Sequence, residues 1–190
     1  MPLKVLVVDL GSQWTHRIWR TLRDLNCESE IIPSNTPLSK IKDADALVFS
    51  GGACRIGKGE LSAAGNCDLF LDKFTGGILG VCSGQQVIAL HYGGKVAPAV
   101  KPEYGPVEIH VVGEDDLFRG FPRKFKAWAS HNDEVKNAPG FKLLASSADC
   151  KWHAFKHERK PVYGTLFHPE VQHTEHGDEI YANFLKALKK

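Results

Sequence analysis

With 190 residues, the chain is long enough for one well-cored domain and short for two, so we expect a single domain over residues 1–190. A formal net charge of +2 gives no electrostatic reason to expect nucleic acid or a membrane as a partner. The five cysteines are irregularly spaced and include no C-x-x-C pair, which argues against a disulfide framework or a cysteine zinc site. This cysteine usage favours a reducing, cytoplasmic setting.

Short aliphatic runs alternate with an amphipathic segment in the first part of the chain. Val5–Val8 and Ala46–Ser50 are typical of buried strands, Glu30–Pro33 predicts another strand, and Trp14–Leu25 has apolar residues at helical spacing. Such alternation predicts an α/β fold: an open, largely parallel (mixed) twisted sheet with helices on both faces. Asp9 and Gln13 follow the first strand, where either a ligand-binding or a loop-capping role is expected.

A cysteine occupies the turn between the next predicted strand and helix. The apolar run Ile78–Val81 predicts a buried strand, and helical spacing resumes around Gln86. Gly80 and Gly84 flank Cys82 at two residues on either side, as in a nucleophile elbow where strand and helix approach closely. The start of the helix would favour the thiolate of Cys82, and Gln86 would lie one turn later on the same helix face. A buried structural cysteine is the alternative.

The rest of the chain predicts further strands and two more helices. Residues 101–106 are expected to form a loop, and the clean alternation of 107–112 predicts an antiparallel strand. Residues 126–130 lead into a cluster of hydrogen-bonding side chains at 130–134. The remaining expected elements are a helix at 68–74, strands at 141–147, 154–156 and 162–167, and an amphipathic closing helix at 177–189.

The motif His168-Pro169-Glu170 directly follows the last predicted strand. Proline restricts His168 to an extended conformation and turns the chain, which can bring the Glu170 carboxylate back to the imidazole. With Cys82 as nucleophile, His168 as base and Glu170 as the group that orients the imidazole, the sequence offers the three parts of a cysteine hydrolase. Taken alone, the motif is also compatible with a strand-ending turn and a surface carboxylate.

Two other patterns call for comparison with known sites. Gly52–Lys58 has the G-x-x-x-x-G-K spacing of a phosphate-binding loop, but Gly59 stands where Mg²⁺ needs a hydroxyl. We therefore favour Gly51-Gly52 as a backbone turn that supplies half of an oxyanion hole, with the Ser83 amide as the other half. The spacing of His168, His173 and His176 fits no common zinc template, and we expect no metal.

Three motifs in order resemble the class I, triad-type glutamine amidotransferases. They are Ser50-Gly51-Gly52, the segment Gly80-Val81-Cys82-Ser83-Gly84-Gln85-Gln86, and Phe167-His168-Pro169-Glu170. Within that family the chain looks most like the glutaminase subunits of two-chain GMP synthetases. The residues behind this finer resemblance are Asp9–Gln13, Trp128–Asp133 and His168–Glu175.

The resemblance implies a flavodoxin-like fold and hydrolysis of L-glutamine through a cysteinyl thioester. It implies Cys82, His168 and Glu170 as catalytic residues and Gly52 and Ser83 as oxyanion donors. Substrate-binding residues would be Gln86 and a loop formed by Ser130, His131, Asn132 and Asp133. A zwitterionic substrate needs an acceptor for its ammonium group, and Asp133 can provide it.

The resemblance also implies a partner. Ammonia would pass to a separate synthetase chain, an ATP pyrophosphatase that aminates XMP, in a heterodimer or a higher assembly. No cofactor is expected on this chain, and ATP and Mg²⁺ would bind the partner.

The chain departs from the family pattern in one segment: Ala53 follows the paired glycines, where proline is frequent, and the next loop, Cys54–Gly59, is unusually glycine-rich and basic. We hypothesise that the oxyanion hole is incomplete in the isolated chain and is completed when the synthetase docks.

Three other functions are alternatives to a glutaminase subunit of this kind: an amidotransferase subunit of another synthetase, a free-standing γ-glutamyl hydrolase, and a regulator that binds glutamine without cleaving it.

Overall fold

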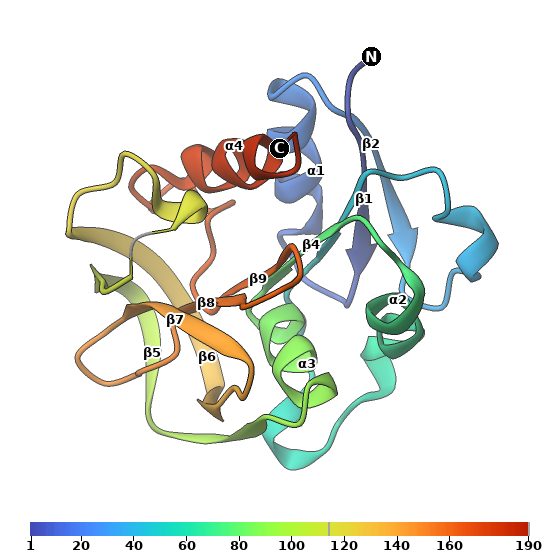
Figure 1. Cartoon of the computed structure of the whole chain (residues 1–190). Coiled ribbons are helices and arrows are strands. Elements are labelled where there is room, and N and C mark those ends of the chain that lie inside the picture. Colours follow the sequence, from blue (N-terminus) through green and yellow to red (C-terminus); the bar gives the residue numbers. More distant parts are fainter. Residues whose placement is uncertain (114, 190) are drawn as a thin grey trace.

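The computed structural model describes residues 1–113 and 115–189 (Figure 1). Within these residues, one nine-stranded sheet has the order β2-β1-β3-β4-β9-β8-β7-β5-β6. Five neighbouring strands are parallel: β2 (Glu28–Pro33), β1 (Lys4–Asp9), β3 (Ala46–Phe49), β4 (Gly77–Val81) and β9 (Val162–Thr165). The others pair antiparallel: β8 (Ala154–His157), β7 (Phe141–Ser146), β5 (Lys95–Val111) and β6 (Lys124–Asn137). The predicted mixed α/β fold is confirmed.

Helices cover both faces of the parallel part of the sheet (Figure 1). On one face, α1 (Thr15–Asp24) and α4 (Gly177–Ala187) pack against a core that includes Val7 and Leu79. On the other face, α2 (Cys67–Lys73) and α3 (Ser83–His91) pack against a core that includes Val8 and Phe49. Because successive side chains of a strand point to opposite faces, the continuous apolar run of β1 supplies both cores. Short 3-10 turns complete the chain: η1 (Leu38–Lys40), η2 (Ile56–Lys58), η3 (Ser62–Ala64) and η4 (Asp116–Phe118).

The antiparallel arm formed by β5 and β6 differs from the prediction. The expected loop at 101–106 is wrong, because these residues belong to the 17-residue strand β5. Likewise, the polar residues Ser130–Asp133 lie in strand β6 and not in a loop. The register shifts between Pro98 and Glu103, and Gly105 has a φ of 93°, so bulging and a left-handed residue accommodate the local sequence. Cross-strand pairing thus overrides the loop propensity of proline and glycine.

The carboxyl ends of the parallel strands meet at one edge of the sheet. There β1 ends at Asp9, β3 at Phe49 and β4 at Val81, and the chain continues into the Gly11–Trp14 turn, the Gly51-Gly52 turn and Cys82. Ligand sites of open α/β sheets lie at this edge. Among the described residues, the structure contains no helix with the length and apolar character needed to cross a bilayer.

Candidate active site

Cys82 lies in the strained turn that the glycine spacing predicts. Its φ of 51° and ψ of −108° are unusual for a residue with a side chain. The flanking glycines make the turn possible: a Cβ on Gly80 would lie 2.5 Å from the backbone carbon of Gly84, and one on Gly84 would lie 2.6 Å from the Phe49 oxygen. Strand β4, helix α3 and strand β3 therefore approach more closely than any larger residue would allow.

His168 and Glu170 form a buried pair just beyond strand β9. The Nδ1 atom of His168 lies 2.7 Å from Oε1 of Glu170, and both side chains are at most 4% exposed. The Tyr181 hydroxyl donates to Oε2 of Glu170 at 3.4 Å. With Nδ1 facing the carboxylate, the imidazole presents Nε2 to other groups.

The imidazole of His168 and the thiol of Cys82 meet beside the Gly51 turn. A Cβ placed on Gly51 would lie 3.1 Å from Cε1 of His168 and 3.5 Å from Cβ of Cys82. On another side, the indole of Trp14 packs edge-on against the imidazole, with ring centroids 4.5 Å apart. The thiol can donate to the Ser130 carbonyl oxygen, 3.7 Å from Sγ. Residues from the two ends of the chain thus converge on one cysteine.

The electrostatic surroundings make His168 a stronger base than a free histidine. Burial by itself lowers the pKa of His168, but the negative charge of Glu170 and the contact with Cys82 outweigh it and raise this pKa to about 10. An imidazole with a raised pKa accepts the thiol proton more readily, and its protonated form is then held between two anionic groups.

The two expected oxyanion donors lie next to the cysteine. Ser83 opens helix α3, where the first amide groups have no intrahelical acceptor. Its hydroxyl donates to the Gly52 carbonyl oxygen at 3.0 Å, which ties the Gly51-Gly52 turn to the elbow. Gly52 admits no side chain, since a Cβ would lie 2.4 Å from the Leu10 oxygen.

A cavity of about 440 Å³ opens over Cys82, within the size range of small-molecule sites. All the expected substrate-binding residues contribute to its wall, together with Trp14, Arg55 and Tyr104, which the sequence did not single out. Gln86 donates from Nε2 to the Asp133 backbone oxygen at 2.9 Å. Asp9 instead has a capping role, because its Oδ1 accepts from the Gly11 amide and the Thr15 hydroxyl.

The Asp133 carboxylate is bonded to an arginine from another loop. Arg55 donates from Nε to both carboxylate oxygens at 3.2 and 3.1 Å and from Nη2 to Oδ1 at 2.8 Å. The Gly57 amide donates to Oδ2 at 3.1 Å. These bonds leave the Asp133 side chain 3% exposed and that of Arg55 29% exposed.

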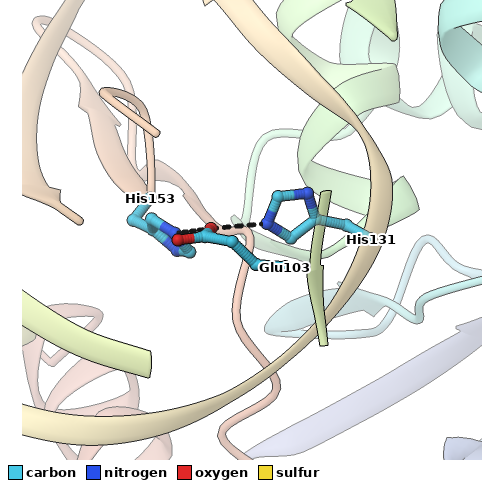
Figure 2. Close-up of side chains that lie close together, drawn as sticks. All are labelled: Glu103, His131 and His153. Atoms are coloured by element: carbon cyan, nitrogen blue, oxygen red, sulfur yellow. Dashed lines mark hydrogen bonds and ion pairs between the residues drawn. The ribbon is translucent and has the colours of Figure 1, made fainter. Parts of the chain in front are cut away.

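His131 belongs to a buried cluster with Glu103 and His153 (Figure 2). Glu103 Oε2 lies 2.9 Å from Nε2 of His131 and 2.7 Å from Nε2 of His153, while the Ser147 hydroxyl donates to Oε1 at 2.7 Å. Burial raises the pKa of Glu103, but hydrogen bonds from both histidines and Ser147 outweigh it, so this pKa stays below its usual range.

The Glu103 cluster has the residue types of a metal site, yet its hydrogen bonds favour a different role. Both Nε2 atoms lie within hydrogen-bond distance of the same Glu103 oxygen, so each imidazole bonds to the carboxylate by donating from Nε2. A metal at the Nε2 atoms would move both protons to Nδ1, and neither buried Nδ1 atom has a hydrogen-bond partner. Metal-binding histidines ordinarily donate this second N–H to an acceptor. We therefore interpret the cluster as a hydrogen-bonded support for the strand that contains Ser130 and Asp133.

The other histidines of the H-x₄-H-x₂-H pattern do not join His168. His173 packs against Trp128, with ring centroids 5.1 Å apart, and His176 contacts Glu179 at 2.8 Å. In the Gly52–Lys58 segment, the Gly57 amide faces Asp133, an anion that would repel a phosphate.

Comparison with known proteins agrees with this geometry. The class-I glutamine amidotransferase family matches residues 6–188, and the chain belongs to this family. A curated relative, a glutamine-hydrolyzing GMP synthase subunit of Thermococcus kodakarensis, is 51% identical over 95% of this chain and 96% of its own. The corresponding GMP synthase subunit of Pyrococcus abyssi is 49% identical over 96% and 97% of the two chains.

A solved structure is similar throughout. A crystal structure described as that of a GMP synthase subunit, from Thermoplasma acidophilum, superposes with a TM-score of 0.95 at 43% identity. It covers 100% of this chain and 95% of that chain. A glutamine amidotransferase from Thermotoga maritima, 19% identical with a TM-score of 0.75, shares the fold.

Proposed function

We propose that this chain is the glutaminase subunit of a two-subunit GMP synthase. It would hydrolyse L-glutamine and deliver ammonia to an ATP-dependent synthetase subunit that converts XMP to GMP. The observation that supports the chemistry is the convergence of Cys82 and the His168–Glu170 pair at one cavity. The relatives named above support the choice of synthetase, because their names specify one subunit of a glutamine-hydrolysing GMP synthase.

In the first step, His168 accepts the thiol proton of Cys82, and the sulfur attacks the side-chain carbonyl carbon of glutamine. The carbonyl oxygen becomes an oxyanion, for which the Gly52 and Ser83 amides are the proposed donors. When the tetrahedral intermediate collapses, the C–N bond breaks and His168 returns the proton to the leaving nitrogen. The products are ammonia and a γ-glutamyl thioester on Cys82.

In the second step, His168 takes a proton from water, and the oxygen attacks the thioester carbonyl carbon. The C–S bond breaks, the sulfur recovers its proton from His168, and glutamate leaves. Glu170 fixes the orientation of the imidazole and stabilises its charged form in both steps, as the 2.7 Å bond to Nδ1 allows.

The proposed substrate contacts place the zwitterionic end of glutamine at strand β6. Gln86, Ser130, His131, Asn132 and Asp133 would position it, with the Asp133 carboxylate as the acceptor for the α-ammonium group. This chain would need no cofactor and no metal. ATP and Mg²⁺ would bind the synthetase chain, and the two chains would assemble in the cytoplasm as a heterodimer or larger.

The test combines the chain with the candidate synthetase, XMP, ATP, Mg²⁺ and glutamine, and measures GMP. We expect GMP with glutamine for the native chain, and none for Cys82→Ala. Ammonium chloride in place of glutamine should restore GMP formation with Cys82→Ala, because only the ammonia supply is lost. Hydrolysis of glutamine without GMP would instead favour another synthetase or a free-standing hydrolase, and glutamine hydrolysis by Cys82→Ala at the native rate would contradict the chemistry.

A further inference from the structure

The acceptor proposed for the α-ammonium group of glutamine is already occupied in the structure. Asp133 accepts three contacts from the Arg55 guanidinium and one from the Gly57 amide, so both of its carboxylate oxygens are engaged. A guanidinium and an ammonium group are both cationic hydrogen-bond donors that bind carboxylates. They therefore compete for the same oxygens.

The backbone around Arg55 is held in place while its side chain remains accessible. The Ile56 side chain is 3% exposed within the core, and a Cβ on Gly57 would lie 2.7 Å from the backbone carbon of Ala97 and 2.9 Å from Cγ of Asp133. The Arg55 side chain, by contrast, is 29% exposed and lies on the cavity wall. A change of side-chain rotamer is therefore enough to release Asp133, without unfolding of η2.

A second carboxylate is available to the released guanidinium. Glu60 accepts a hydrogen bond from the Arg55 amide at 2.8 Å, and its charge, after that of Asp133, contributes to the raised pKa of Arg55. Glu60 is exposed, so its carboxylate remains in water and can pair with Arg55 at little desolvation cost. Arg55 thus has two anionic partners, Asp133 on the cavity wall and the solvent-exposed Glu60.

We propose that Arg55 occupies the α-ammonium subsite of the glutamine cavity and that glutamine binds by displacing its guanidinium from Asp133 toward Glu60. This inference rests on the proposed function. It makes Arg55 a residue that governs substrate entry: the charge-assisted bonds of the Arg55–Asp133 pair must break before the ammonium group can bind. Any event that stabilises Arg55 at Glu60 would increase the affinity of the chain for glutamine.

The test compares two reagents that alkylate Cys82 in the full chain. A chloroketone analogue of glutamine has the α-ammonium group and needs the subsite, whereas iodoacetamide has no ammonium group and does not. Because Cys54 also lies on the cavity wall, the rates are measured on the peptide that contains residue 82 by mass spectrometry. The ratio of the two rate constants cancels any change in the intrinsic reactivity of the thiol.

For Arg55→Gln, we expect this ratio to rise about tenfold, as loss of a charge-assisted competitor predicts. Glu60→Gln keeps an oxygen acceptor for the Arg55 amide but removes the alternative charge, so the ratio should fall below that of the native chain. Lys58→Gln is the matched control, because it removes an exposed positive charge from the same turn and should leave the ratio unchanged.

An unchanged or lower ratio for Arg55→Gln would overturn the inference, and a lower one would assign Arg55 to the α-carboxylate of the substrate instead. A second measurement, the protection of Cys82 from iodoacetamide by free glutamine, distinguishes failure of this inference from failure of the proposed function. Protection with the same concentration dependence in the native chain and Arg55→Gln refutes only the role of Arg55. Absence of protection in both refutes the glutamine site and the inference with it.

Discussion

At Gly51, just after strand β3, the backbone lies so close to the imidazole of His168 that a methyl group would not fit without a shift. A Cβ at this position would lie 3.1 Å from Cε1 of His168. The same Cβ would lie 3.5 Å from Cβ of Cys82, so the glycine faces both proposed catalytic side chains. The absence of a side chain here therefore allows base and nucleophile to approach.

Gly51→Ala should reduce glutamine hydrolysis far more than it reduces stability. Relief of the 3.1 Å contact requires the imidazole to shift by a few tenths of an ångström, and small displacements of reacting groups cost about tenfold or more in rate. The measurement is kcat for glutamate release, with the thermal midpoint as the control for folding. A variant with native kcat would show that Gly51 does not constrain the imidazole.

Glu170→Gln should shift the alkaline limit of activity. Burial lowers the pKa of His168, and the charge of Glu170 is the main cause that raises it instead to about 10. The imidazolium must protonate the leaving nitrogen, so activity falls as the pH rises through this pKa. Without the charge of Glu170, we expect the alkaline limb of kcat to move down by about 1 to 3 pH units.

The same substitution has a consequence for stability. A raised pKa favours the folded state fully below the pKa of a free histidine, about 6.5, and this contribution is lost as the pH rises to about 10. Glu170→Gln removes it, so the native chain should lose more stability than the variant across this interval. Glu179→Gln, at the exposed His176–Glu179 pair, is the control, and it should change neither the pH profile of kcat nor the pH profile of stability. Identical alkaline limbs in native chain and Glu170→Gln would contradict the role of Glu170.

The parts of the site that sequence could predict depend on short spacings. The elbow at Cys82 follows from an apolar run and two glycines, and the His168–Glu170 contact follows from one intervening proline. Both are decided within a few residues by backbone geometry. The same reasoning predicted the parallel strands, because a strand buried on both faces is recognisable from its own composition.

The parts that sequence could not predict depend on pairs far apart in the chain. Arg55 and Asp133 are 78 residues apart, and Glu103 lies 28 and 50 residues from its two histidines. No local pattern marks either contact. The proline and glycine around residue 103 even predicted a loop, whereas pairing with β6 keeps this segment in strand β5. The exposed and polar side of the site was therefore predicted less completely than the elbow.

Gly84→Ala should destabilise the fold by about 1 to 3 kcal/mol and abolish activity, because overpacking at a rigid contact forces the backbone apart. Its Cβ would lie 2.6 Å from the Phe49 oxygen, between α3 and β3. The measurements are the free energy of unfolding in urea and kcat. Gly93→Ala is the control: its φ of 79° disfavours alanine but no heavy atom lies within 4 Å, so it should cost stability and keep kcat. Native stability in Gly84→Ala would refute the close approach.

Glu103→Gln should destabilise the chain by about 1 to 3 kcal/mol, since a buried donor that loses its acceptor incurs its full desolvation cost. Whichever way the new amide is turned, its N–H₂ group faces a donor, because both histidines bond to Oε2 and the Ser147 hydroxyl donates to Oε1. The Michaelis constant for glutamine should rise as well, because the Glu103 cluster supports the strand that contains Asp133.

Two comparisons give the Glu103→Gln experiment its meaning. Glu108→Gln on the same strand removes the exposed contacts with His110 and with Lys124 of β6, and it should leave the urea midpoint nearly unchanged because exposed ion pairs contribute little. The second comparison uses acid pH. Because the pKa of Glu103 lies below its ordinary value of 4.5, the ionised carboxylate contributes to the free energy of unfolding above that pH, and this contribution is lost as the pH falls further. The difference in unfolding free energy between the native chain and Glu103→Gln should therefore become smaller in acid. A difference that does not change with pH would mean that packing, and not the charge of Glu103, holds β5 and β6 together behind the cavity.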